Sequence, residues 1–153
     1  MTEAEVRDAV SVAYEYCYLH DEWVTSLTES LQGVTVSEAL ARPTPSSKCI
    51  WEIVLHVAVW NENIVERTKT GEKARPAEGA WPPLPEAADS LAWEAAKARL
   101  WKSLNGIEEM MKTSSLDELN GGPYGIADLL CRFFHVAYHI GQIVKQREII
   151  TSQ

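Results

Sequence analysis

Residues 125–150, GIADLLCRFFHVAYHIGQIVKQREII, decide the fold because they read as one long helix with apolar side chains on almost every side. Those side chains are Leu129, Leu130, Phe133, Phe134, Val136, Ala137, Tyr138, Ile140, Ile143 and Val144. A helix that is apolar all round belongs in the interior of a protein. We therefore predict a helix from about Gly125 to Ile150 and expect it to be the most buried element.

Three further segments have apolar residues at the three- and four-residue spacing that is typical of helices. They are Glu3 to Gln32, about Cys49 to Thr70 and about Glu86 to Lys112. Helix-breaking residues separate the segments, namely Gly33, Pro43, Pro45, Gly71, Pro76, Pro82, Pro83, Pro85, Gly121, Gly122 and Pro123. The pattern predicts four long helices.

Two of the connections between these helices have features of their own. The stretch before the second helix contains a predicted single turn at Ser37 to Ala41, and Ser46 or Ser47 is expected to cap the helix that follows. The connection from Gly71 to Pro85 is too long for a tight turn between helices. It should pass over the outside of the helices with Trp81 beneath it.

The length of the chain, 153 residues, is that of a single domain. No segment alternates apolar and polar residues in the manner of a half-buried strand. We predict an all-α fold: one domain, residues 1–153, forming an antiparallel four-helix bundle with a long connection between helices 2 and 3.

The charge balance is acidic, with 14 Lys and Arg against 22 Asp and Glu and a net charge of −8. Because no basic run is present, nucleic acids and anionic membranes are poor candidate partners. No stretch reaches the roughly 18 consecutive apolar residues of a membrane-spanning helix, and the N-terminus does not read as a signal peptide. The three cysteines, Cys17, Cys49 and Cys131, are widely spaced and expected to be reduced, which indicates a cytoplasmic protein.

The histidines carry the clearest chemical signal. His135 and His139 are four residues apart, on the same side of the predicted helix. A zinc protease with this spacing needs a glutamate where Val136 stands, and no histidine has the glutamate three residues earlier that di-iron bundles require. His56 lies on the apolar side of the second helix. We therefore predict that His56, His135 and His139 bind one metal ion.

Three histidine ligands leave coordination positions open for water or substrate, as in catalytic metal sites. Imidazole suits zinc, nickel, copper and iron without selecting among them. The alternative is that the three histidines are core residues whose ring nitrogens are satisfied by hydrogen bonds. His20 lies among charged residues and is expected to face solvent.

Four further residues near the histidines have open roles. Gln142 is placed to hydrogen-bond a ligand ring or a bound water, or else to be an exposed or interhelical amide. Trp60, one turn after His56, is expected in the core or on the pocket wall. Cys131, four residues before His135, is placed to approach the metal or to be a simple apolar residue. Gly141, inside a helix, indicates a close approach of another backbone or of a ligand.

Two stretches resemble the DinB/YfiT-like family. Residues 47–60, SKCIWEIVLHVAVW, are similar to its second-helix signature, and residues 134–143, FHVAYHIGQI, to its fourth-helix signature H-x-x-Y-H-x-G-Q. Residues 81–85, WPPLP, leading to Trp93, fit its middle region. The resemblance covers essentially the whole chain. It implies a four-helix bundle, often a homodimer, whose three histidines bind a divalent metal in an open pocket, with zinc or nickel favoured and iron or copper as alternatives.

The resemblance also implies an activity. Characterised relatives include transferases and isomerases that use low-molecular-weight thiols such as bacillithiol, mycothiol or glutathione, and a metal lowers the pKa of a bound thiol or water. We expect a metal-dependent enzyme acting on a small molecule, with thiol transfer to an electrophile as the first reaction and hydrolysis as the second. The alternative is a non-catalytic bundle that captures a small molecule in a stress response. The family is named after a DNA-damage-inducible gene, but the acidic surface gives no reason to expect DNA binding.

Overall fold

The structure is a computed structural model that describes residues 2–72, 74–120 and 126–152. Within these ranges the chain forms seven helices and no strand, which confirms the all-α prediction. The elements are α1 (Glu3–Tyr18), α2 (Leu27–Ser30), α3 (Val36–Leu40), α4 (Ile50–Thr70), α5 (Ser90–Thr113), α6 (Leu116–Asn120) and α7 (Ile126–Thr151). The predicted start of the last helix, Gly125, and the predicted break at 121–123 lie outside the described residues. No helix in the described part is long and apolar enough to cross a bilayer.

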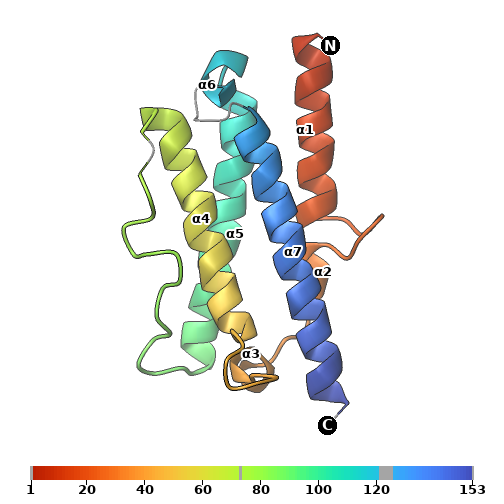
Figure 1. Cartoon of the computed structure of the whole chain (residues 1–153), viewed down its shortest axis with the longest axis vertical. Helices are drawn as coiled ribbons and strands as arrows, with labels where there is room; N and C mark the ends of the chain where they lie inside the picture. Colours follow the sequence, from red (N-terminus) through yellow and green to blue (C-terminus); the bar gives the residue numbers. More distant parts are fainter. Residues whose placement is uncertain (1, 73, 121–125, 153) are drawn as a thin grey trace.

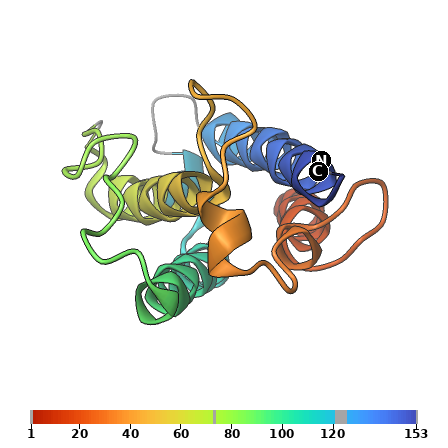
Figure 2. The same ribbon diagram turned by 90° about the horizontal axis from the view of Figure 1, so that it is seen from below.

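The four long helices α1, α4, α5 and α7 lie side by side (Figures 1 and 2). Helices α4 and α5 run in the same direction: Trp51 packs against Trp93 at their first turns. Further along both helices, Asn61 donates to Ser103. The prediction of an antiparallel arrangement is wrong for this pair, because the long connection returns the chain to the end of the molecule where α4 began (Figure 1).

Helix α7 does run antiparallel to α4. Near one end of the pair Arg67 forms an ion pair with Asp128 at 3.1 Å, and near the other end Gln146 donates to the backbone carbonyl of Lys48. The middle of α4 therefore faces the middle of α7. This pairing places His56 opposite the turn of α7 that carries the other two candidate ligands.

The first predicted helix, Glu3 to Gln32, is broken in the structure. Helix α1 ends at Tyr18, and a loop leads to the single turn of α2. In this loop the carboxylate of Asp21 accepts from the backbone N–H of Ser26, whose hydroxyl in turn caps α2. Short polar side chains of this kind offer the backbone hydrogen bonds that compete with a continuous helix. The break lies between Tyr18, the last residue of α1, and Leu27, the first residue of α2.

The ends of α4 differ in how well the sequence predicted them. The N-cap is Cys49 rather than Ser46 or Ser47, because Glu52 accepts a hydrogen bond from the backbone N–H of Cys49. Gly71 ends the helix as predicted, with a φ of 71° that favours glycine. The predicted turn at 37–41 is the short helix α3.

The most buried helix is α4 and not α7, contrary to the prediction. Helix α4 lies between α5 and α7 (Figure 2), and residues 50–59 are buried without interruption. On α7 the side chains of Phe134 and Tyr138 are 73% and 63% exposed. Helix α7 therefore has apolar residues on almost every side although one of its sides is exposed.

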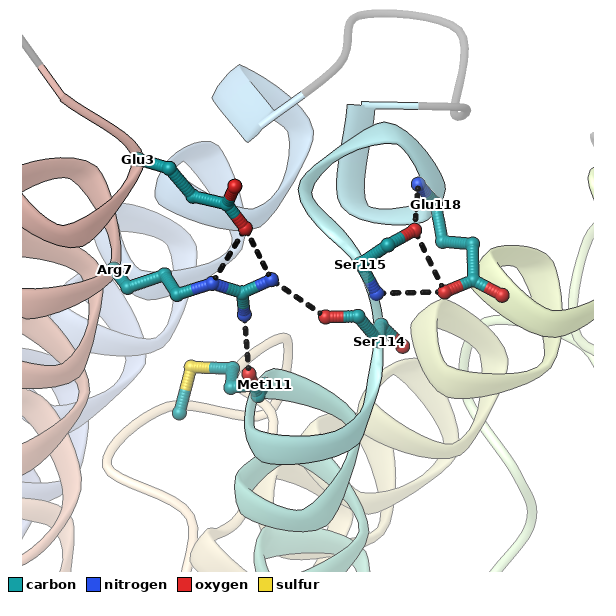
Figure 3. A network of polar contacts seen from close by, with 6 residues as sticks. All are labelled: Glu3, Arg7, Met111, Ser114, Ser115 and Glu118. Atoms are coloured by element: carbon teal, nitrogen blue, oxygen red, sulfur yellow. Dashed lines mark hydrogen bonds and ion pairs between the residues drawn. The ribbon is translucent and has the colours of Figure 1, made fainter.

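Arg7 joins α1 to the C-terminal end of α5 (Figure 3). Its guanidinium donates to the backbone carbonyls of Met111 and Ser114 and pairs with Glu3 on its own helix. These carbonyls lie where α5 ends, and a cation there is also favoured by the helix dipole. Just beyond, Ser115 and Glu118 cap α6 reciprocally.

Replacing Arg7 by alanine is expected to lower the free energy of unfolding by about 1–3 kcal/mol, since two backbone carbonyls lose a charged donor. Urea unfolding followed by circular dichroism measures the change. Lys145→Ala, at an exposed surface pair, is the control and should change it by less than about 0.5 kcal/mol. Equal effects of the two substitutions would contradict the role given to Arg7.

Candidate metal centre

The three predicted histidines converge on one point, and we call them the histidine cluster. Nε2 of His135 lies 3.2 Å from Nε2 of His56 and 2.9 Å from Nε2 of His139. One ligand atom from each residue lies within 4.8 Å of the other two. Two helices far apart in sequence, α4 and α7, thus supply one set of nitrogen donors.

The spacing of these nitrogens suits a small divalent ion. Ligands of a tetrahedral ion at 2.0–2.1 Å lie about 3.3 Å from one another. Two of the three separations, 3.2 and 2.9 Å, come within a few tenths of an ångström of that value, and the third pair of ligand atoms lies within 4.8 Å. A set of imidazoles with neither carboxylate nor thiolate suits zinc, nickel, copper or iron. The cluster can therefore hold such an ion, and metal binding itself stays a prediction.

Two of the rings are oriented by hydrogen bonds on their far side. Nδ1 of His56 donates to the backbone carbonyl of Ala80 at 2.5 Å. Nδ1 of His139 donates to Oε1 of Gln142 at 2.7 Å, and Gln142 in turn donates to the hydroxyl of Tyr138. With the proton on Nδ1, the Nε2 lone pairs of both rings point to the shared centre. Gln142 thus takes the first of its two predicted roles, a hydrogen bond to a ligand ring.

All three rings are neutral at pH 7. Burial lowers the pKa of His56 to about 4 and, together with the charge of Arg132, lowers that of His135 to about 3. Burial also lowers the pKa of His139. Only a neutral imidazole has the lone pair that a metal needs, so proton competition is weak at neutral pH.

Trp81, from the long connection, covers one side of the cluster. Its ring stacks on that of His56, with centroids 3.8 Å apart and planes inclined by 18°. Trp81 thus points inward from its loop, as predicted, but 37% of its surface is exposed, so the loop does not cover it. The indole restricts water on this side and fixes the plane of the His56 ring.

Arg132 contacts the third ring. Its Nη2 lies against Nδ1 of His135, and its guanidinium lies over the ring of Trp60, 5.6 Å from the ring centre. Because a guanidinium only donates, Nδ1 of His135 is the acceptor here. Burial lowers the pKa of Arg132 to about 10, which still leaves it positively charged at neutral pH.

A cavity of about 150 Å³ lies between α4 and α7 and borders His135. Trp60 lines it and thus takes the second of its two expected places, the pocket wall rather than the core. Cys131 also lines it and is exposed, but does not belong to the histidine cluster. His20 is exposed, as predicted. A Cβ added at Gly141 meets nothing within 4 Å, so the predicted close approach of another backbone is not found within this chain, and the approach of a ligand stays a prediction.

The family model of the DinB superfamily matches residues 19–143. This chain belongs to the DinB superfamily. The matched range contains all three histidines of the cluster, and it confirms the resemblance read from residues 47–60 and 134–143. No curated protein and no solved structure matches the chain. Membership of the DinB superfamily and the converging Nε2 atoms are both compatible with a metal-binding protein.

Sequence reasoning missed three contributors to the centre in this member of the DinB superfamily. Nothing in the sequence indicates the carbonyl of Ala80, because backbone atoms carry no residue signal. The partner of Trp81 depends on the path of a proline-rich loop. Arg132 had a usable signal, since it is a charged residue in an apolar run, three positions before His135 and therefore on its side of the helix.

Replacing Gln142 by alanine is expected to weaken zinc binding about 10–100-fold, because His139 loses the acceptor that orients it. Competition with a chromophoric chelator measures the affinity. Gln146→Ala is a matched control: Gln146 is buried one turn further along α7 and bonds the backbone of Lys48 instead. If both variants bind zinc as the wild type does, Gln142 does not support the ring.

Proposed function

We propose that this chain is a metal-dependent enzyme of the DinB superfamily, with His56, His135 and His139 binding one divalent ion, zinc or nickel before iron or copper. The observation that carries the proposal is the convergence of three neutral imidazole nitrogens from two helices. Such an ion lowers the pKa of a bound thiol or water. The reaction proposed first is transfer of a low-molecular-weight thiol to an electrophile, and the second is hydrolysis.

The residues around the cluster support a reaction centre more than a purely structural one. Ala80 and Gln142 hold two rings in the tautomer that a ligand needs. Trp81 shields one side, and a cavity large enough for a small molecule borders one of the three rings, that of His135. A closed structural site has four protein ligands, and the described residues bring only three together here.

Steady-state assays with the zinc- and nickel-loaded protein test the proposed activity. The substrates are thiols paired with an electrophilic aromatic chloride, and p-nitrophenyl esters for hydrolysis. We expect turnover with one class, abolished in His139→Ala. If protein carrying one ion per chain shows no turnover with either class, the catalytic part of the proposal fails and the non-catalytic binding role takes its place.

A small-molecule substrate, a homodimeric state and a cytoplasmic location complete the proposal. They rest on the family resemblance, the size of the cavity and the acidic, cysteine-poor composition. Sedimentation velocity distinguishes a dimer from the 17.1 kDa monomer. A single monomeric species at micromolar concentration would remove the dimer from the proposal.

A further inference from the structure

The cavity beside His135 has a positively charged wall. Two guanidiniums border it, those of Arg67 and Arg132, together with the carboxylate of Asp128. Arg67 is neutralised by Asp128 at 3.1 Å. Arg132 takes part in none of the ion pairs that the described residues form. One positive charge therefore remains uncompensated at this wall.

The uncompensated charge of Arg132 is unusual because the residue is nine-tenths buried, with 9% of its surface exposed. Buried charges in proteins are normally paired. Its Nε has no hydrogen-bond partner among the described residues, and the same holds for Nε of Arg67 and Nε1 of Trp60. All three are N–H donors of residues that line the cavity. The fourth unpaired buried side-chain atom at this cavity, Oδ1 of Asn63, is an acceptor. Unpaired donors therefore outnumber unpaired acceptors at the wall, and an anion supplies acceptors.

Arg132 contacts the histidine cluster at the ring of His135. This contact is incompatible with metal binding by Nε2 of His135. The guanidinium donates to Nδ1 of His135, which places the imidazole proton on Nε2. A metal held by Nε2 requires the proton on Nδ1 instead, and two donors then face each other. An ion bound through Nε2 would therefore separate Arg132 from His135, and Nη2 of Arg132 would then need a new acceptor.

We propose that this cavity is an anion subsite that binds a carboxylate group of the substrate through Arg132, next to the metal centre. The inference rests on the proposed metal site and adds a class of substrate to it. A guanidinium and a carboxylate match as a bidentate pair. The single net charge at the wall favours a monoanion over a phosphate dianion. A volume of about 150 Å³ accommodates the carboxylate with a short carbon chain.

The proposal makes anion binding dependent on the metal. In the metal-free protein Arg132 is occupied by His135, so a carboxylate competes with that contact. In the loaded protein the competition is gone and the metal adds further positive charge beside the cavity. Carboxylate affinity is therefore higher with the ion present.

Isothermal titration calorimetry with propionate tests the subsite, with neutral propionamide as the isosteric comparison. Zinc is titrated first, so that a failure to bind zinc, which overturns the proposed function, is seen before any anion is added. With one zinc bound, we expect propionate to bind and propionamide to bind at least tenfold more weakly. We also expect at least threefold weaker propionate binding without zinc.

Substitutions locate the binding site of the probe. Arg132→Gln is expected to keep one zinc per chain and to weaken propionate binding at least tenfold. Arg99→Gln, which removes the same charge from a surface pair with Glu62 and Glu78, should leave it unchanged. Should Arg132→Gln not fold, Arg132→Lys keeps the charge without the planar fork and should still weaken binding about threefold.

Three results would overturn the subsite while leaving the metal centre in place. The first is equal binding of propionate and propionamide. The second is unchanged propionate affinity in both Arg132 variants, which would place the anion on the zinc itself. The third is tighter binding of inorganic phosphate than of propionate. Equal propionate affinity with and without zinc would overturn the link between the metal and Arg132.

Discussion

Replacing His56 by alanine is expected to lower the affinity for zinc by about 10³-fold or more, above the 10–100-fold that loss of an outer hydrogen-bond partner costs. The reason is geometric. His56 is the one ligand from α4, and its Nε2 lies 3.2 Å from that of His135 on α7. Two imidazoles on one helix are left, with more positions open to water. Competition with a chromophoric chelator at pH 7 measures the loss.

The zinc affinities of two other histidine variants provide the comparison for His56→Ala. His139→Ala should cost about as much as His56→Ala, although the two residues come from different helices. His20→Ala is the matched control, because His20 is exposed and outside the cluster, and it should leave the affinity unchanged. If His56→Ala binds zinc as tightly as His20→Ala does, α4 contributes no ligand and the centre does not exist as described.

The second large effect concerns the acid sensitivity of the metal-free protein. His56 has an ordinary pKa of 6.5 when exposed and one of about 4 in the folded state, where burial disfavours the charged ring. Above pH 6.5 both states are neutral and nothing is lost. As the pH falls below 6.5 the unfolded chain takes up the proton first, so stability declines until the pH approaches 4. Between pH 6.5 and 5 the expected loss from His56 is about 2 kcal/mol.

Urea unfolding of the metal-free protein at pH 7, 6 and 5 measures this decline. Carboxylates affect the pH dependence of stability mainly below pH 5. One example is Glu52, whose ordinary pKa of 4.5 is lowered by its hydrogen bonds and by Arg42. His56→Gln should therefore lose about 2 kcal/mol less than the wild type over the same interval. An identical decline in His56→Gln and the wild type would show that His56 is not held neutral by burial.

The sequence predicted helical segments well where apolar spacing and breakers agree. Helix α4 ends at Gly71 because glycine accepts the positive φ at that position. Prediction failed where local polar hydrogen bonds decide, as at Asp21 and Ser26, which end the first helix early. It also failed for the relative direction of α4 and α5, because periodicity describes one helix at a time and a long loop permits either direction.

The candidate site was predictable to the extent that it follows helical spacing. His135 and His139 share a side of α7 by their four-residue separation, and His56 lies on the buried side of α4. Helical periodicity does not predict the tertiary contacts that place Ala80, Trp81 and Arg132 around these rings. Those contacts depend on loop paths and on side-chain conformations across two helices.

X-ray absorption at the zinc edge of the loaded, untagged protein tests the central claim most directly. We predict one ion per chain with three imidazole nitrogens at 2.0–2.1 Å, completed by at least one oxygen from solvent. The signal of the imidazole rings should be lost in the variant with His56, His135 and His139 all replaced by alanine. A shell of oxygens alone, a sulfur at about 2.3 Å from a cysteine, or an unchanged spectrum in that variant would contradict the account.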